Sequence, residues 1–332
     1  MPVQFGVVLP QGFKRDLGSI DDPVAKYEAM TRVAIEAERL GYASVWLYDH
    51  LHAEQRPGGT LVTDETIFEC WTSAAALARD TTTIRIGQMV SCNIYRNPAL
   101  LAKMASTVDV LSHGRLDFGL GAGWYEMEAH AYGYAFPSDP ERVRRLDEAL
   151  QIIRALWTEA SATFTGKYYQ IEGAINEPKG VQRPHIPLWV GGGGERTTLR
   201  LVAKYANACN VIAHEAATVS RKFAILREYC DREGRDYAAI HKSVHAFVIL
   251  LEPGEDLDAA TKERGNLSLD VIRRANIVGT PSEVVEQLQR LVESGVEYFV
   301  LYFRNRLVQL HSIRLFAHEV LPMFIDKADQ AI

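Results

Sequence analysis

An acid and two histidines directly follow a run of apolar residues. The run Ser44-Val-Trp-Leu-Tyr-Asp-His-Leu-His52 ends on Asp49, His50 and His52. An imidazole titrates near neutral pH and a neighbouring carboxylate can hold a donor, so Asp49 and His50 suit general acid–base chemistry. His50 and His52 would share one side of an extended strand, which is also the spacing of a metal-binding pair. The segment leaves both chemistries open, beside the plain interpretation of a polar strand end.

The metal hypothesis needs further ligands from later strand ends. Only His214 and His245 are candidates there, so the ligand count falls short of a catalytic zinc site. The sequence also has no G-x-S-x-G nucleophile elbow. We therefore expect no metal, and we expect His52 to be an ordinary loop residue.

A run of four glycines, Gly191 to Gly194, lies between an apolar run and a helical pattern that starts near Arg196 and Thr197. Glycines there let backbone N–H groups approach an anion at a helix N-terminus, which suits a single phosphate group. The alternative is a tight turn that binds nothing. The other glycine run, Gly119-Leu-Gly-Ala-Gly123, lacks the third glycine of the dinucleotide fingerprint because position 124 is Trp.

The elements that would position these residues alternate between β-rich runs and helical patterns. Asp22-Pro23, Asn97-Pro98 and Asp139-Pro140 have the signature of helix starts. Eight β-rich runs are recognisable, at residues 3–9, 43–48, 84–90, 116–121, 187–190, 208–212, 242–251 and 297–303. Eight such units in 332 residues predict a (β/α)8 barrel formed by one domain over residues 1–332. Residues from about 160 to 186 have no helical period, and we interpret them as an insertion beside the barrel mouth, for which a hairpin is one candidate form.

The active site of such a barrel is built from the loops that follow its strands. The segments to weigh are therefore Gln11, Asp49 with His50, Ser91 to Asn93, Ala122 to Trp124, Gly191 to Gly194, His214 and Arg304. Aromatic residues also lie near strand ends, where most of them would belong to the core or the rim: Trp46, Tyr95, Trp124, Tyr125 and Trp189.

Composition narrows the class of partner. The net charge is -6 without a long basic run, so nothing resembles the electrostatic footprint of a nucleic-acid binder. No segment approaches the roughly 20 apolar residues that span a membrane. Four scattered cysteines without a C-x-x-C pair, and no signal-peptide pattern, lead us to expect a cytoplasmic protein with reduced thiols.

Several segments together resemble the luciferase-like superfamily of flavin- or deazaflavin-dependent oxidoreductases, and within it the probable coenzyme F420-dependent branch. They extend over nearly the whole chain: Phe5 to Gly12, Trp46 to His50, Ile86 to Cys92, Tyr95 to Pro98, Ser112 to Arg115, Gly119 to Glu126, Ala131 to Gly133, Pro187 to Gly194 and Val278 to Pro281. The fold that this resemblance implies is a (β/α)8 barrel with an insertion, in agreement with the strand count.

The resemblance also implies roles for single residues. Asp49 matches an acid that contacts the deazaflavin, and His50 matches the group that exchanges a proton with the substrate. Met89-Val90 matches a non-prolyl cis peptide behind the ring, with Ser91 and Cys92 following along the cofactor. The remaining cofactor matches are Ala122 and Gly123 as a backbone contact, and Gly193, Gly194, Arg196 and Thr197 as a clamp on the phosphate.

One position departs from the resemblance. The sugar-phosphate dehydrogenases of the family carry Glu directly after the glycine that corresponds to Gly123, as a second acid/base group, and this chain has Trp124. The resemblance therefore does not imply a second acid/base group or a phosphorylated sugar substrate for this chain.

The sequence thus predicts an F420-dependent oxidoreductase that moves a hydride between the deazaflavin and a small organic substrate, an alcohol or carbonyl or an activated double bond. Gln11, Tyr95, Trp124 and Tyr125 would line the substrate pocket, and the resemblance suggests a homodimer. The alternatives are an FMN-dependent monooxygenase on the same scaffold, a metal-dependent barrel hydrolase, and a cofactor-binding protein without catalysis.

Overall fold

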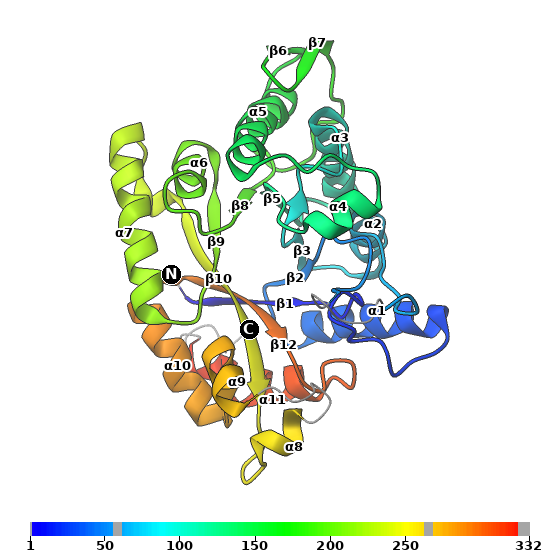
Figure 1. The fold of residues 1–332 in the computed structure, drawn as a ribbon, viewed down its shortest axis with the longest axis vertical. Helices are drawn as coiled ribbons and strands as arrows, with labels where there is room; N and C mark the ends of the chain where they lie inside the picture. The colour runs from blue at the N-terminus through cyan, green and yellow to red at the C-terminus, as the bar shows by residue number, and fades with distance from the viewer. Residues whose placement is uncertain (1, 56–61, 262–267, 325–332) are drawn as a thin grey trace.

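Eight parallel strands close into a barrel in the computed structural model, which describes residues 2–55, 62–261 and 268–324 (Figure 1). Each barrel strand pairs with the next one around the barrel, and the last pairs with the first. In that order they are β1 (Gln4–Val8), β2 (Ser44–Leu47), β3 (Arg85–Gln88), β5 (Leu116–Gly121), β8 (Leu188–Gly191), β9 (Ala208–Ile212), β10 (His241–Leu250) and β12 (Tyr298–Phe303). All eight predicted strands are present, so the predicted (β/α)8 barrel is confirmed.

A helix follows each barrel strand and covers the outside of the barrel. These helices are α1 (Pro23–Arg39), α2 (Cys70–Asp80), α3 (Pro98–Leu111), α5 (Asp139–Thr158), α6 (Thr198–Tyr205), α7 (Ala216–Glu233), α10 (Pro281–Glu293) and α11 (His311–Glu319). The Asp22 side chain caps α1 by accepting from the Ala25 N–H, and Asn97 caps α3 by accepting from the Ala99 N–H. Helix α5 begins one residue earlier than its Asp-Pro signature predicts, with Ser138 at the N-cap.

The remaining elements are additions to the barrel. They are β4 (Ser91–Cys92), which pairs with β5; α4 (Glu126–Ala131); α8 (Leu257–Thr261); α9 (Leu269–Ala275); β11 (Ile277–Gly279), which pairs with β10; and 3-10 turns at Tyr237–Ala239 and Leu321–Met323. In the segment where the sequence suggests an insertion, β6 (Ala162–Thr165) and β7 (Gln170–Ala174) form an antiparallel hairpin at the top of Figure 1. Its turn reaches the strand ends, because Tyr169 Oη accepts from Asn93 Nδ2 at 3.3 Å.

Aromatic side chains fill the inside of the barrel. The ring centroid of Trp46 lies 4.8 Å from that of Trp189, which lies 5.2 Å from that of Tyr298. Gly87 leaves room for the indole, since a Cβ there would lie 2.2 Å from Trp46. Trp46 and Trp189 are therefore core residues, as most strand-end aromatics are expected to be.

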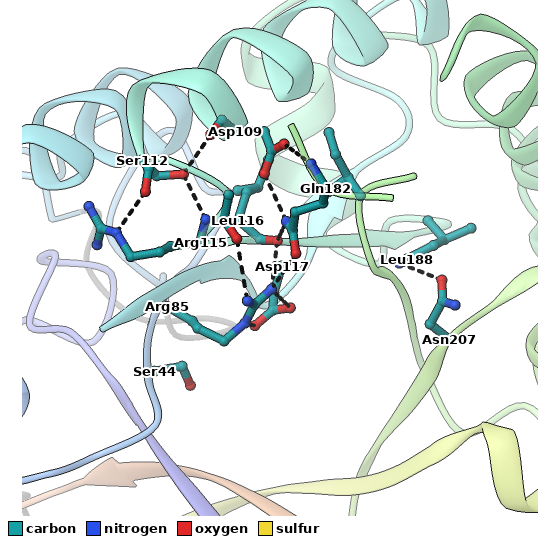
Figure 2. Close-up of polar contacts among 12 residues, drawn as sticks. Ser44, Arg85, Asp109, Ser112, Arg115, Leu116, Asp117, Gln182, Leu188 and Asn207 are labelled. Carbon is teal, nitrogen blue, oxygen red and sulfur yellow. Dashed lines mark hydrogen bonds and ion pairs between the residues drawn. The ribbon is translucent and has the colours of Figure 1, made fainter. Parts of the chain in front are cut away.

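Polar contacts gather where β3 and β5 begin (Figure 2). Arg85 at the start of β3 makes a bidentate ion pair with Asp117 on β5, at 2.7 and 2.8 Å. Gln182 joins this network by donating to Asp109 and to the Leu116 carbonyl. A site is expected at the opposite end of the barrel, where the strands finish.

None of the helices in the described ranges is both long enough and apolar enough to cross a membrane. The four cysteines are free and buried.

Candidate functional site

The His50 imidazole lies just beyond the end of β2 and is held from two sides. Its ring stacks on Phe13 in the loop after β1, with centroids 3.6 Å apart and planes 5° apart. Its Nδ1 lies 2.8 Å from Oε2 of Glu128 on α4. The other ring nitrogen, Nε2, bonds to no residue in the described ranges, and the side chain is 11% exposed. One ring nitrogen is thus fixed while the other is left for a ligand.

Glu128 is an acid partner that the sequence alone did not indicate. Its carboxylate is fully buried and also accepts bonds from Tyr95 Oη at 2.5 Å and from the backbone N–H groups of Leu51 and His52. Burial alone would raise the pKa of Glu128, but the bonds from His50 and the other donors outweigh it, and the pKa lies below its usual range. An ionised Glu128 accepts only, so we assign a proton to His50 Nδ1, which donates it to the carboxylate.

Asp49 is directed away from His50. Its side chain is fully buried, and its oxygens form a bidentate pair with Arg96, at 2.6 and 3.0 Å, and accept from the Cys92 N–H at 2.8 Å. Arg96 also contacts Glu69 at the N-cap of α2. Asp49 therefore anchors the chain after β4 to the end of β2.

The peptide between Met89 and Val90 is cis, as the resemblance implies. Val90 packs against two neighbouring strands at glycines, because a Cβ on Gly121 or Gly191 would lie 2.6 Å from a Val90 methyl carbon. Side chains larger than hydrogen would therefore displace Val90 at both positions.

The chain after the cis peptide lies against the end of β5. Ser91 Oγ accepts from the Trp71 indole at 3.0 Å. Gly123 has a φ of +85°, and a Cβ there would lie 2.9 Å from Cys92 Sγ. Burial raises the pKa of Cys92 to about 12, so this thiol stays protonated. Ala122, half-buried, precedes Gly123 in the same loop.

The four predicted substrate-pocket residues do not all reach the mouth. Trp124 is 60% exposed, stacks on Tyr125 and meets the His50 ring edge to face at 5.7 Å. Tyr95 is buried behind Glu128 and bonds to it. Gln11 is fully buried, and its amide donates to the Phe68 carbonyl and accepts from the Tyr48 N–H. Gln11 and Tyr95 are thus buried and hydrogen-bonded, and their place in the substrate pocket stays a prediction.

Two buried tyrosines contact further titratable side chains: His245, which the sequence suggested only as a possible metal ligand, and Asp16, which the sequence analysis did not single out. His245 accepts from Tyr48 Oη through Nε2 at 3.0 Å and lies 3.0 Å from the Val300 carbonyl through Nδ1, and burial lowers its pKa to about 4. Asp16 accepts from Tyr302 Oη at 2.8 Å, and burial raises its pKa to about 6.

The glycine turn after β8 has the form of an anion site. Five successive backbone N–H groups, from Gly193 to Thr197, donate to no acceptor in the described part of the chain, and α6 begins at the next residue. Lys222 on α7 reaches this turn, with Nζ 2.5 Å from the Gly193 carbonyl oxygen. A Cβ on Gly193 would lie 2.9 Å from Lys222 Nζ, so a side chain there would move the lysine away from the turn. The turn therefore fits a phosphate group.

The second histidine, His52, is not placed as a metal ligand would be. His52 Nδ1 bonds to the Ala53 carbonyl, and the ring packs on Tyr125 and Tyr132. Within residues 2–55, 62–261 and 268–324, no three His, Cys, Asp or Glu side chains gather as a metal site requires. His214 bonds to the Arg274 carbonyl instead.

Comparisons with known proteins agree with this architecture. The sequence profile of the luciferase-like monooxygenase family matches residues 3–266. An F420-dependent glucose-6-phosphate dehydrogenase of Amycolatopsis mediterranei is 34% identical over 182 residues, 53% of this chain and 50% of that enzyme, so the chain aligns with only about half of that relative's length. The enzyme of the same name from Kineococcus radiotolerans is 26% identical and covers 87% of this chain and 91% of its own length.

An FMNH2-dependent dimethylsulfone monooxygenase of Pseudomonas fluorescens is 24% identical over 68% of this chain and 70% of that enzyme. Among solved structures, an F420-dependent secondary alcohol dehydrogenase in complex with an F420–acetone adduct superimposes with a TM-score of 0.80. It covers 98% of this chain and all of its own, at 21% identity, and at that identity the match shows the fold.

Proposed function

Because this chain belongs to the luciferase-like monooxygenase family, we propose that it is an oxidoreductase that uses coenzyme F420 with a small organic substrate. The observation that carries the proposal is the His50 imidazole beyond the end of β2. The buried Glu128 carboxylate fixes it through Nδ1, and Nε2 has no bonding partner among the described residues. Relatives named as F420-dependent dehydrogenases support the choice of cofactor.

The residues that would hold the cofactor follow four neighbouring barrel strands, β2, β3, β5 and β8. Asp49 with the segment Met89, Val90, Ser91 and Cys92 would bound the ring, and Ala122 and Gly123 would contact the cofactor through the backbone. Gly193, Gly194, Arg196 and Thr197 would take the phosphate on the unpartnered N–H groups of the turn. When bound, the deazaflavin supplies the hydride acceptor or donor.

His50 would carry the proton that accompanies the hydride. With Nδ1–H donated to Glu128, Nε2 can take a proton from a substrate hydroxyl in oxidation, or return it to a carbonyl in reduction. The imidazolium formed in oxidation would lie beside a buried carboxylate, which stabilises it. Trp124 and Tyr125 would flank the substrate and exclude water.

The substrate class follows from where the carboxylate lies. Glu128 is behind the imidazole, on Nδ1, and acts through it. An alcohol and carbonyl pair, or an activated double bond, needs one proton at one atom, and this arrangement supplies that proton. Trp124 stands where the sugar-phosphate dehydrogenases of the family have their second acid, so we propose a substrate other than a sugar phosphate.

The test is a parallel binding titration of the purified protein with F420 and FMN, followed by turnover measurements. We expect F420 to bind more tightly, and His50→Ala to retain F420 binding while turnover falls by about 10²- to 10⁴-fold. Tight FMN binding with oxygen-consuming turnover would overturn the proposal in favour of an FMN-dependent monooxygenase, the alternative favoured by the dimethylsulfone monooxygenase relative. Full turnover in His50→Ala would remove His50 from the chemistry.

A cytoplasmic location and a homodimer complete the proposal. The four buried free thiols suit a reducing compartment, and sedimentation of the purified protein measures the oligomeric state.

A further inference from the structure

A glutamate follows the glycine turn directly, at the place where a phosphate is proposed to bind. Glu195 Oε1 lies 2.9 Å from Arg221 Nη2 and 3.6 Å from Lys222 Nζ, and its side chain is 34% exposed. Lys222 is 14% exposed and bonds to the Gly193 carbonyl. An acid thus sits among the cations and N–H groups of an anion site, although a carboxylate there repels any anion that binds.

The position of this acid limits how far a bound anion can lie from it. An anionic oxygen that contacts Lys222 Nζ at an ordinary distance of about 2.8 Å lies within about 7 Å of Glu195 Oε1. That separation is shorter than the Debye length of about 8 Å at physiological ionic strength, so the repulsion is not screened away. It grows in proportion to the charge on the anion.

Two phosphate classes differ in that charge. A phosphomonoester has a second ionisation near pKa 6 and is close to a dianion above neutral pH, whereas a phosphodiester carries one charge. FMN ends in a phosphomonoester, and F420 carries a phosphodiester.

We infer that Glu195 is a specificity residue that lowers affinity for a dianionic phosphomonoester more than for a monoanionic phosphodiester, and so biases the turn toward F420 over FMN. The inference rests on the proposed function for the assignment of the turn to the cofactor phosphate. Lys222 is the cation that contacts either phosphate, and Glu195 offsets part of its charge.

The experiment uses a pair of flavins with the same ring. FMN and its phosphate monomethyl ester differ by one charge at pH 8, and riboflavin is the reference without phosphate. Dissociation constants are measured by flavin fluorescence for the wild type, Glu195→Gln, Lys222→Gln and Glu172→Gln. The last is a control with the same charge change on the exposed β7 strand of the hairpin.

Because the repulsive free energy doubles from monoanion to dianion, the fold-gain for FMN should be the square of that for the ester. For Glu195→Gln we expect affinity to rise about threefold for the ester and about ninefold for FMN, with riboflavin unchanged. Lys222→Gln should weaken both phosphates, and Glu172→Gln should change neither. These results would support the inference.

The inference about Glu195 would be overturned if Glu195→Gln raised the affinity for FMN and for its methyl ester equally. It would also be overturned if the affinity for FMN did not rise or if riboflavin gained as well. Failure of FMN to bind any variant at millimolar concentration would have the same consequence. F420 is titrated alongside. If the wild type does not bind F420, the proposed function fails while the flavin pair still reports on Glu195. If F420 binds and the flavin gains are equal, only the role of Glu195 fails.

Discussion

Replacing Glu128 by Gln tests the link between the buried carboxylate and His50. The carboxylate accepts from four donors, and Gln keeps its shape while exchanging one acceptor oxygen for an NH2 group. If the remaining oxygen keeps the Leu51 and His52 N–H groups, the new NH2 group faces His50 Nδ1. Two donors would then meet, so the imidazole is expected to switch tautomer, with Nδ1 accepting and the proton on Nε2.

The expected loss of activity follows from the charge. Two unit charges about 4 Å apart attract by about 4 kcal/mol at an effective dielectric of about 20. His50 Nδ1 lies 2.8 Å from Glu128 Oε2, with the carboxylate fully buried and the imidazole 11% exposed. Losing most of this attraction in the transition state corresponds to a fall in turnover of about 10²- to 10³-fold. The bond from Tyr95 would also weaken, and we expect the free energy of unfolding to fall by about 1–3 kcal/mol.

Two measurements check this prediction, and one of them needs no substrate. Nitrogen-15 NMR of the two His50 ring nitrogens reports the tautomer in the free protein, and F420 absorbance reports turnover. Glu126→Gln is the matched control, because Glu126 is an exposed acid on the same short helix. If Glu128→Gln leaves the Nδ1–H tautomer and the turnover unchanged while the protein stays folded, the argument that Glu128 orients His50 is wrong.

Three further predictions concern the buried charges around the mouth. Arg96→Met leaves the fully buried Asp49 carboxylate without its partner, so we expect a loss of about 3–5 kcal/mol in urea unfolding, and part of this should return in the Asp49→Asn, Arg96→Met double variant. The pKa of His245 is lowered to about 4, so the unfolded state binds more protons between pH 6.5 and 4 and His245 destabilises the fold as pH falls through that window. Urea unfolding of His245→Gln should lose that dependence, and an unchanged pH slope would contradict the assignment. The pKa of Asp16 is raised to about 6, so the native state binds more protons between pH 3.8 and 6 and stability falls as pH rises through that window. Asp16→Asn should therefore leave a steeper rise of stability with pH than the wild type shows, and a flatter one would refute this sign.

The barrel could be predicted because its signals are local. Each strand is a short apolar run, and helix starts such as Asp22-Pro23 form their caps within three residues. The glycine turn could also be recognised in the sequence, because four successive glycines between an apolar run and a helical pattern indicate a tight turn. The sequence could not show that Lys222 reaches it from α7, because a lysine on an amphipathic helix has the same pattern whether or not it meets a neighbouring turn.

The acid of the site was missed for a related reason. Glu128 lies two residues after Glu126 in a six-residue helix, and nothing in that spacing tells which acid is buried. Burial is decided by the approach of α4 to the end of β2, where the Leu51 and His52 N–H groups point at the carboxylate. The sequence therefore showed that Trp124 replaces the acid of the sugar-phosphate dehydrogenases. It gave no sign that Glu128, four residues later, supplies a buried carboxylate.

The placement of the two carboxylates bears on the chemistry more than their number does. Asp49 is paired with Arg96. The donors around Glu128 hold its pKa below the usual range, so this carboxylate acts on another group rather than carrying a proton itself. In the proposed function, proton exchange would then fall to His50 Nε2, the ring nitrogen that does not contact Glu128. A reaction that needs an acid and a base on opposite sides of the substrate would require a second titrating group where Trp124 stands. In the proposed function, a hydride transfer with a single proton requires only the arrangement that is present, which fits the interconversion of an alcohol and a carbonyl or the reduction of an activated double bond.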